Sequence, residues 1–308
     1  MHVLSNDDKL DAVLNLGNES NDLTNREDFT LIKMIFLDID GTLINDQGII
    51  TPRTLDALLA VQERGVRVAI ASGREERGLY QWADPLKLKE HHGILLTCNG
   101  ARVLDAQTGE VLFARQIPVA EAKKVLRHLK QFDVVPMIAH GVYMHTTDVY
   151  GGMIDYRGEK FDIVRFEARS NRYLLCEHED LEAWVTEPIE KILTAAAPAY
   201  LVAHAEEMGA PFRDTLSAMF TADFYYEYMP KGVEKGTAIE AVLPKLGLHR
   251  EEIMAFGDAE NDRSMIEFAG IGVATGNAMD SVKAAADWVS ADCNHDGVAE
   301  ALAHFGLI

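Results

Sequence analysis

The stretch MIFLDIDGT, residues 34–42, runs from four apolar residues into two acidic residues that are separated by one position. A short apolar run of this kind predicts a buried strand, and Gly41 permits a sharp turn after it. Thr51 as a helix cap and Pro52 in the first helical turn predict a helix that Gly65 ends. The sequence therefore predicts a strand, a loop and a helix in this order.

The same alternation continues along the chain. Apolar runs at residues 66–70, 94–97, 253–256 and 271–274 predict further strands, and residues 102–104 and 111–113 predict a hairpin. Strands that alternate with helices favour right-handed crossovers and a parallel sheet, whose strand ends share one edge. We expect an α/β fold in which polar residues at the strand ends converge.

A different pattern occupies residues 117–221. Strand-like runs at 134–138, 142–144, 173–176 and 200–202 are mixed with expected helices at 119–132 and 180–195, and acidic strand ends are missing. We interpret 117–221 as an inserted α+β domain that the chain enters and leaves once, so that residues 33–116 and 222–308 form the main domain. The polar and acidic residues 1–32 are expected to be a loosely ordered extension.

The composition of the 308-residue chain excludes several classes of protein. A formal net charge of -20 opposes binding to nucleic acid or anionic lipid, and no apolar run is long enough to span a bilayer. A small phosphate can still bind where cations, backbone amides and a metal ion dominate locally. Cys98, Cys176 and Cys293 are far apart, which favours a reducing cytoplasm over a disulfide framework or a zinc site. The oligomeric state is left open.

Asp38 and Asp40 are the first candidate catalytic residues. Two carboxylates this close repel each other unless a hard divalent cation lies between them, and one could attack while the other transfers protons. Thr42 adds a hydroxyl just beyond. The alternative is a solvated acidic turn, whereas a calcium loop of the EF-hand type would need further acids where Leu43, Ile44 and Asn45 stand.

A second set of acidic residues follows the predicted strand at 253–256, in the segment GDAEND at residues 257–262. Asp258 is the expected third metal ligand, Asp262 could orient a lysine or support the metal site, and Asn261 could face the substrate. Capping of a helix N-terminus is the alternative explanation, because Asp and Asn are common there.

Ser72 and Gly73 follow the strand at 66–70 and could bind a phosphate oxygen through a hydroxyl and a backbone amide. Lys235 begins a predicted helix, where the helix dipole does not favour a cation. A functional lysine would neutralise the nucleophile and the phosphate together. The alternatives are that Ser72 and Gly73 form a simple turn and that Lys235 is an ordinary surface lysine.

Together these four motifs resemble those of the haloacid dehalogenase (HAD) superfamily. Residues 38–42, residues 72–74, Lys235 and residues 257–262 are similar to its four motifs in order, and the resemblance covers about Lys33 to the C-terminus. Asn99-Gly100-Ala101 and the position of the insertion resemble the Cof-type branch, whose nearest members are sugar-phosphate phosphatases. The resemblance implies a Rossmann-like parallel-sheet core with the insertion as a cap domain.

The family resemblance also implies a reaction. Asp38 would form an aspartyl-phosphate, Asp40 would protonate the leaving oxygen and activate water, and Mg²⁺ would be held by Asp38, the backbone carbonyl of Asp40 and Asp258. We expect a phosphatase of small phosphate monoesters, with Arg74 reaching the substrate from the core. The alternatives are a phosphomutase similar to phosphomannomutases and a noncatalytic phosphosugar-binding regulator.

A further string of metal-binding residue types, Cys-Glu-His-Glu-Asp at residues 176–180, is interpreted as a solvated strand end. Consecutive residues of a strand alternate between its faces, so the five side chains cannot converge on one ion.

Overall fold

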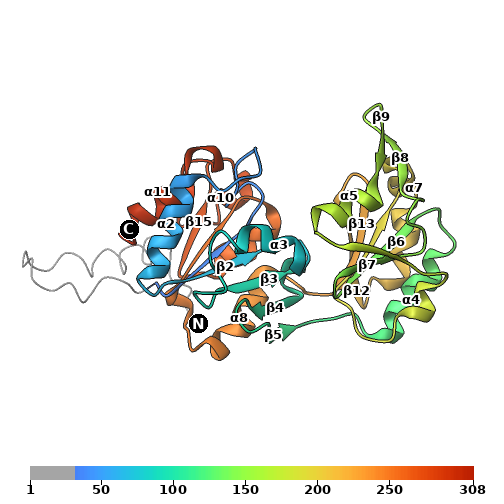
Figure 1. The fold of residues 1–308 in the computed structure, drawn as a ribbon, viewed down its shortest axis with the longest axis horizontal. Helices are drawn as coiled ribbons and strands as arrows, with labels where there is room; N and C mark the ends of the chain where they lie inside the picture. Colours follow the sequence, from blue (N-terminus) through green and yellow to red (C-terminus); the bar gives the residue numbers. More distant parts are fainter. Residues whose placement is uncertain (1–31) are drawn as a thin grey trace, which may run out of the picture.

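The computed structural model describes residues 32–308, so the predicted extension, apart from Ile32, lies outside the described residues. The described chain forms two bodies that lie side by side and are joined by two chain crossings (Figure 1). We call the body that contains β1 the core and the other body the cap. No helix within residues 32–308 has the length and apolar character needed to cross a membrane.

The core is built on an eight-stranded sheet in the order β16-β15-β14-β1-β2-β3-β4-β5. Neighbouring strands from β16 to β3 are parallel, and β4 and β5 continue the sheet in antiparallel pairing. The predicted α/β fold with a parallel sheet is thus confirmed. The strands are β1 (Met34–Leu37), β2 (Arg67–Ala71), β3 (Ile94–Thr97), β4 (Arg102–Asp105), β5 (Val111–Ala114), β14 (Ile253–Gly257), β15 (Ile271–Ala274) and β16 (Trp288–Val289).

Helices cover both faces of the core sheet (Figure 1). On β1, Ile35 and Leu37 pack in the cluster that contains α2, α3 and α11, whereas Met34 and Phe36 pack in the cluster that contains α8 and α9. Burial on both faces explains why the strand is apolar at every position. The core helices are α2 (Pro52–Glu63), α3 (Glu76–Ala83), α8 (Lys235–Leu246), α9 (Arg263–Phe268), α10 (Asp280–Lys283) and α11 (Gly297–His304), with short 3₁₀ turns η2 (Cys98–Gly100), η4 (Arg250–Glu252), η5 (Glu260–Asp262) and η6 (Cys293–His295).

The cap contains a six-stranded sheet in the order β10-β7-β6-β11-β13-β12 and a separate two-stranded hairpin of β8 and β9. In the six-stranded sheet β10 and β7 are parallel, and the other neighbours are antiparallel. The cap elements are α4 (Val119–Leu129), β6 (Val135–His140), β7 (Tyr143–Thr146), β8 (Met153–Tyr156), β9 (Glu159–Asp162), α5 (Ile163–Ser170), β10 (Leu174–Glu177), α6 (Leu181–Trp184), β11 (Ile192–Ala195), α7 (Pro198–Gly209), η3 (Ala210–Phe212), β12 (Leu216–Ala222) and β13 (Tyr225–Pro230).

Two expectations within the cap were wrong. The helix expected at 180–195 is reduced to α6, because Pro188 cannot continue a helix, and the buried residues of β11 pair with β6 and β13 instead. The strand expected at 200–202 lies inside α7, where Pro198 occupies the first turn and the surrounding residues favour a helix.

The predicted end of the insertion at residue 221 also needs correction. This boundary falls inside β12, and β13 pairs with both β11 and β12 in the cap sheet, so residues 222–230 belong to the cap. The chain returns to the core between Lys231 and the start of α8. Arg115 lies on the segment that leads from the core to the cap, and Gly232 lies on the segment that leads back. Nη1 of Arg115 donates to the Gly232 carbonyl at 2.8 Å, so this hydrogen bond joins the two connecting segments.

Candidate active site

A buried lysine lies between two buried carboxylates at the carboxyl edge of the core sheet. Asp38 follows β1, Lys235 begins α8, and Asp262 ends η5. Nζ of Lys235 lies 2.5 Å from Oδ1 of Asp38 and is also ion-paired to Asp262. Lys235 and Asp262 are 0% exposed and Asp38 is 7% exposed. The structure thus brings together three of the residues that the sequence selected.

Burial and neighbouring charges shift the pKa values of both Asp38 and Lys235. Burial is the main reason why the pKa of Asp38 is raised to about 8; the charge of Lys235 opposes this shift, and the neighbouring Asp262 and Asp258 contribute to it. Burial also opposes the charge on Lys235, but Asp38 and Asp262 together raise its pKa above the usual value. The lysine therefore stays cationic, and its single charge does not balance all three carboxylates once Asp38 is ionised.

Asp258 completes the acidic group from the end of β14. Oγ1 of Thr42 donates to Oδ1 of Asp258 at 3.0 Å, and Oδ2 of Asp262 accepts from the amides of Asp258 and Ala259 at 3.0 Å each. Burial raises the pKa of Asp258 to about 6, although the bond from Thr42 opposes the shift. Gly41 has a φ of 82°, and a Cβ there would lie 2.4 Å from Oδ2 of Asp258. The close approach of the two loops therefore requires glycine.

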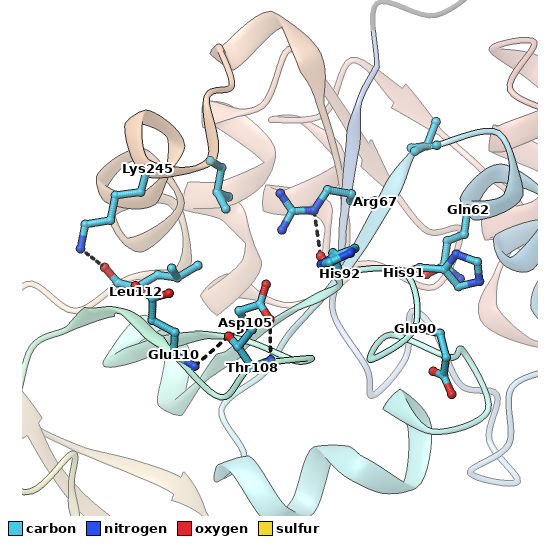
Figure 2. Close-up of a pocket in the computed structure, with 13 residues that line it drawn as sticks. Gln62, Arg67, Glu90, His91, His92, Asp105, Thr108, Glu110, Leu112 and Lys245 are labelled. Carbon is cyan, nitrogen blue, oxygen red and sulfur yellow. Dashed lines mark hydrogen bonds between the residues drawn. The ribbon is translucent and has the colours of Figure 1, made fainter.

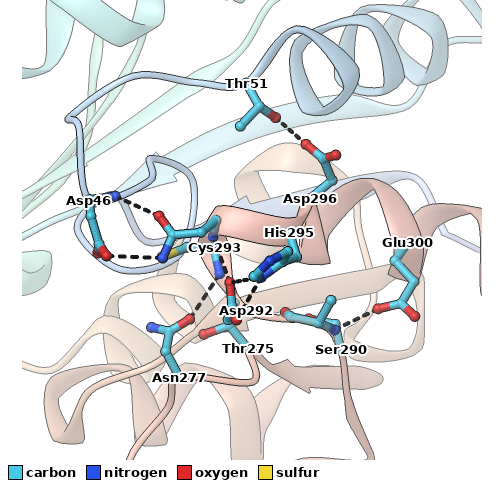
Figure 3. A network of polar contacts seen from close by, with 12 residues as sticks. Asp46, Thr51, Thr275, Asn277, Ser290, Asp292, Cys293, His295, Asp296 and Glu300 are labelled. Carbon is cyan, nitrogen blue, oxygen red and sulfur yellow. Dashed lines mark hydrogen bonds and ion pairs between the residues drawn. The ribbon is translucent and has the colours of Figure 1, made fainter.

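The loop that contains Gly41 is bound to Thr275 and Asn277, which belong to the network of polar contacts that Figure 3 shows. The Gly41 carbonyl accepts from Nδ2 of Asn277 at 2.8 Å and from Oγ1 of Thr275 at 3.2 Å. Asn277 in turn accepts from the amide of Cys293 at 2.9 Å, and Nδ2 of Asn294 donates to Asp46 at 3.0 Å. The segment at 293–297 thus fixes the loop that follows Asp38, and it continues into α11.

Asp40 and Arg74 form a pair at the rim of this group. Nη2 and Nε of Arg74 donate to the two carboxylate oxygens of Asp40 at 2.9 and 3.0 Å. The guanidinium also lies 5.0 Å from the centroid of the Trp82 ring. The side chain of Asp40 is 57% exposed, in contrast to the buried Asp38. Arg74, predicted to reach the substrate, therefore contacts the second aspartate here.

Ser72 and Gly73 lie beside Asn99, a residue to which no sequence pattern assigned a role. Oγ of Ser72 accepts from the amide of Arg74 at 3.2 Å, and the Ser72 carbonyl accepts from the amide of Asn99 at 2.9 Å. Asn99 has a φ of 54°, its side chain lies against Gly73, and its Oδ1 accepts from Asn261 at 3.0 Å. Asn99 thus connects the Ser72–Gly73 turn with Asn261, and only the Asn-Gly pair in the sequence, which favours a positive φ, pointed to it.

A cap lysine also reaches this turn, and no sequence pattern indicated it. Nζ of Lys191 lies 2.9 Å from Oε2 of Glu227, 3.8 Å from Oε1 of Glu75 and 3.4 Å from the Gly73 carbonyl. Burial opposes the charge of Lys191, but Glu227 and Glu75 raise its pKa well above the usual value. A buried cation from the cap therefore contacts the backbone of the predicted phosphate-binding turn.

The donor set suits a hard divalent cation. Oxygens of Asp38, Asp258 and Asp262 lie within 4.8 Å of one another. Asp262 is already bound to Lys235 and two amides, which leaves Asp38 and Asp258 as the available carboxylates. Oxygen ligands and an unbalanced negative charge favour Mg²⁺ over Zn²⁺. The residues present therefore fit the magnesium ion that the family resemblance implies.

A surface hollow of about 610 Å³ lies away from these residues, at the opposite edge of the core sheet. It is lined by Arg67 at the amino end of β2, by Asp105 at the end of β4 and by Lys245 of α8 (Figure 2). None of the candidate site residues contributes to its lining. The acidic group thus lies outside this hollow, on the side where the cap approaches.

Known proteins resemble this chain in sequence and in fold. The family of haloacid dehalogenase-like hydrolases matches residues 35–302. A 5-amino-6-(5-phospho-D-ribitylamino)uracil phosphatase of Bacillus subtilis is 29% identical over 284 residues, which cover 92% of this chain and 98% of the relative.

Two solved structures have the same fold. A haloacid dehalogenase-like hydrolase from Bacteroides thetaiotaomicron gives a TM-score of 0.81 at 30% identity and covers 89% of this chain and 99% of its own. A sugar phosphatase of HAD subclass IIB gives a TM-score of 0.71 at 26% identity, covering 90% of this chain and 100% of its own.

Proposed function

Since the chain belongs to the haloacid dehalogenase-like hydrolases and is a phosphoric monoester hydrolase, we propose that it transfers the phosphoryl group of a small phosphate ester to Asp38 and then to water. The main support for this proposal is the position of Asp38 at the end of β1, beside Lys235. Lys235 holds one carboxylate oxygen, Oδ1, so the other oxygen is free to attack phosphorus.

In the first step, a bond forms between a carboxylate oxygen of Asp38 and phosphorus, and the bond from phosphorus to the leaving alcohol breaks. Asp40 gives a proton to the leaving oxygen. In the second step, water attacks the phosphorus of the aspartyl-phosphate and Asp40 accepts a proton from this water. The bond between phosphorus and Asp38 breaks, which releases inorganic phosphate and restores the Asp38 carboxylate.

The remaining residues bind and orient the phosphoryl group. We expect the hydroxyl of Ser72 and the amide of Gly73 to bind its oxygens, and Lys235 to balance charge beside the nucleophile. Mg²⁺, held by Asp38, Asp258 and the Asp40 carbonyl, would reduce the repulsion between the carboxylate and the phosphate. Arg74 would leave Asp40 for the anionic substrate, which frees Asp40 for proton transfer.

Sugar phosphates are the proposed substrates. The likeness to a sugar phosphatase of HAD subclass IIB supports this choice, as does the B. subtilis relative, whose named substrate carries its phosphate on a ribityl chain. The core residues contact only the groups that every phosphate ester shares, so the cap must select the leaving group. Lys191 is a cap residue that contacts the proposed phosphate-binding turn, through the Gly73 carbonyl.

The test is phosphate release from a panel of sugar phosphates with Mg²⁺ or with a chelator. Asp38→Asn should lower kcat by roughly three orders of magnitude or more, because a neutral amide is a poor nucleophile. Asp56→Asn, the same change on the exposed side of α2, should leave kcat unchanged. Labelled phosphate trapped on a residue other than Asp38 would refute the proposal, and transfer of phosphate back to the sugar would indicate a phosphomutase.

A further inference from the structure

Three metal-binding side chains meet on one face of the cap sheet, far along the chain from the residues described above. His145 lies on β7, Cys176 lies on β10, and His178 follows β10. In the parallel pairing of these strands, Cys176 lies directly beside His145. The amide of His178 donates to the Thr146 carbonyl at 2.8 Å, so the extended pairing continues beyond β10. Strand pairing itself therefore brings the three side chains together.

The alternation of strand residues explains why this group was not recognised in the sequence. It sends Glu177 to the opposite face, and Glu179 lies in a bend beyond the strand, so the string at 176–180 cannot converge as a whole. The same alternation leaves Cys176 and His178 on one face, because they are two residues apart. The third member, His145, comes from another strand, and only the register of β7 and β10 identifies it.

The separations of the ligand atoms are close to those of a tetrahedral metal site. Sγ of Cys176 lies 3.5 Å from Nε2 of His178, and Nδ1 of His145 lies 2.7 Å from the same nitrogen. Each of the three residues offers a ligand atom within 4.8 Å of those of the other two. Bond lengths of about 2.0–2.1 Å to nitrogen and about 2.3 Å to sulfur place neighbouring ligands about 3.3–3.7 Å apart. The sulfur–nitrogen distance already fits, and the two imidazoles need to separate by roughly 0.6 Å.

The surroundings orient one ligand and leave the others accessible. The Trp184 ring stacks on His145 with centroids 4.0 Å apart, and His145 is only 7% exposed. Burial and the neighbouring His178 lower the pKa of His145 to about 4, so its ring is neutral at physiological pH. Its Nε2 is buried without a hydrogen-bond partner among the described residues, whereas Nδ1 faces the other two ligands. Cys176 and His178 are half-buried, so an ion can reach them from solvent.

We propose that His145, Cys176 and His178 bind a borderline-soft divalent cation of the Zn²⁺ class, at a site separate from the acidic residues of the core. One thiolate and two imidazoles are a donor set that suits Zn²⁺ and does not suit Mg²⁺. On binding, Cys176 loses its thiol proton to solvent, and two metal–nitrogen bonds replace the hydrogen bond between the histidines. Water fills the fourth position. The ion would link β7 to β10, which lies at the edge of the cap sheet.

Co²⁺ is the probe that tests this site, because a thiolate bound to Co²⁺ gives a charge-transfer band that oxygen ligands do not. The full chain is titrated with Co²⁺ in excess Mg²⁺, which occupies the acidic residues of the core. We expect one equivalent of Co²⁺ to bind with a charge-transfer band and tetrahedral d–d bands, and Zn²⁺ to displace it. Cys176→Ser should abolish the charge-transfer band, and His178→Gln should weaken binding roughly tenfold or more.

Matched variants separate this site from other sources of the signal. Cys293→Ser changes a second cysteine, and His204→Gln changes another half-buried histidine of the cap, so both should bind Co²⁺ as the unaltered protein does. Asp38→Asn should also bind it unchanged, which makes the result independent of phosphatase activity. The proposal is overturned if the unaltered protein shows no charge-transfer band at one equivalent, if the band persists in Cys176→Ser, or if Cys293→Ser removes it.

Discussion

Mg²⁺ should stabilise this protein more at about pH 8 than at about pH 5.5. Burial raises the pKa of Asp38 from 3.8 to about 8 and that of Asp258 from 3.8 to about 6 in the metal-free protein. Both carboxyl groups ionise near pH 4 in the unfolded chain. Between these values the folded state retains protons that the unfolded state has lost, so the metal-free protein loses stability as the pH rises.

The size of the effect follows from Asp38, which is the more deeply buried of the two. One retained proton changes the free energy of unfolding by up to about 1.4 kcal/mol per pH unit, or about 3.5 kcal/mol over about 2.5 units. Relaxation of the site and entry of water should reduce this to roughly 2 kcal/mol. At roughly 2–4 °C per kcal/mol, Tm should fall by on the order of 4–8 °C. Bound Mg²⁺ keeps the carboxylates ionised, so the fall should disappear in its presence.

The assay is the thermal midpoint across this pH range, with saturating Mg²⁺ or with a chelator. In the chelated series, Asp38→Asn should flatten the dependence on pH, because the group that retains the proton is gone. Asp40→Asn is the matched control, since the exposed Asp40 lies two residues away, and it should keep the dependence. A stabilisation by Mg²⁺ that is equal at both pH values, or larger at the lower one, would refute the assignment of a buried, metal-dependent carboxylate.

Three further substitutions test individual contacts in and around the candidate active site. Gly41→Ala should weaken activation by Mg²⁺ roughly tenfold or more in a titration of activity, because its Cβ would lie 2.4 Å from Asp258, whereas Gly48→Ala, at a similar φ of 74° but in open space, should not. Thr42→Val should raise the Mg²⁺ concentration for half-maximal activity severalfold through loss of its bond to Asp258, and Thr42→Ser should restore it. Lys191→Met should lower the free energy of unfolding by about 3–5 kcal/mol in a denaturant titration, because two buried glutamates lose their cation, and an unchanged midpoint would contradict the buried ion pair.

The geometry of the acidic group could be predicted because of where its residues stand on the sheet. Asp38 and Asp258 follow β1 and β14, which are parallel neighbours, so their side chains share one edge. Lys235 was selected because a cation at the start of a helix needs a partner, and the structure supplies two. In each case a local rule pointed to the same edge of the sheet.

The cap could not be predicted to the same depth, because its important contacts join residues far apart in sequence. Lys191 contacts Gly73 and Glu227, and neither contact leaves a local pattern. The contact of Arg74 with Asp40 also depends on side-chain orientation, which periodicity does not determine. In the mixed cap sheet, strands such as β11 have buried residues but no catalytic residue at their ends that would reveal them in the sequence. The ends of the neighbouring helices depend instead on Pro188, which follows α6, and on Pro198, which begins α7.

The burial that destabilises Asp38 also makes its proposed role as a nucleophile possible. A carboxylate in water is held by hydrogen bonds that must break before it attacks, whereas Asp38 is 7% exposed and has Lys235 on one oxygen only. The same burial holds the carboxyl protonated, and therefore unreactive, until a cation balances Asp258 and Asp262. A metal-starved enzyme should therefore lose activity as the pH falls through the raised pKa of Asp38, about 8, and saturating Mg²⁺ should move this loss to lower pH, because the bound cation keeps the carboxylate ionised.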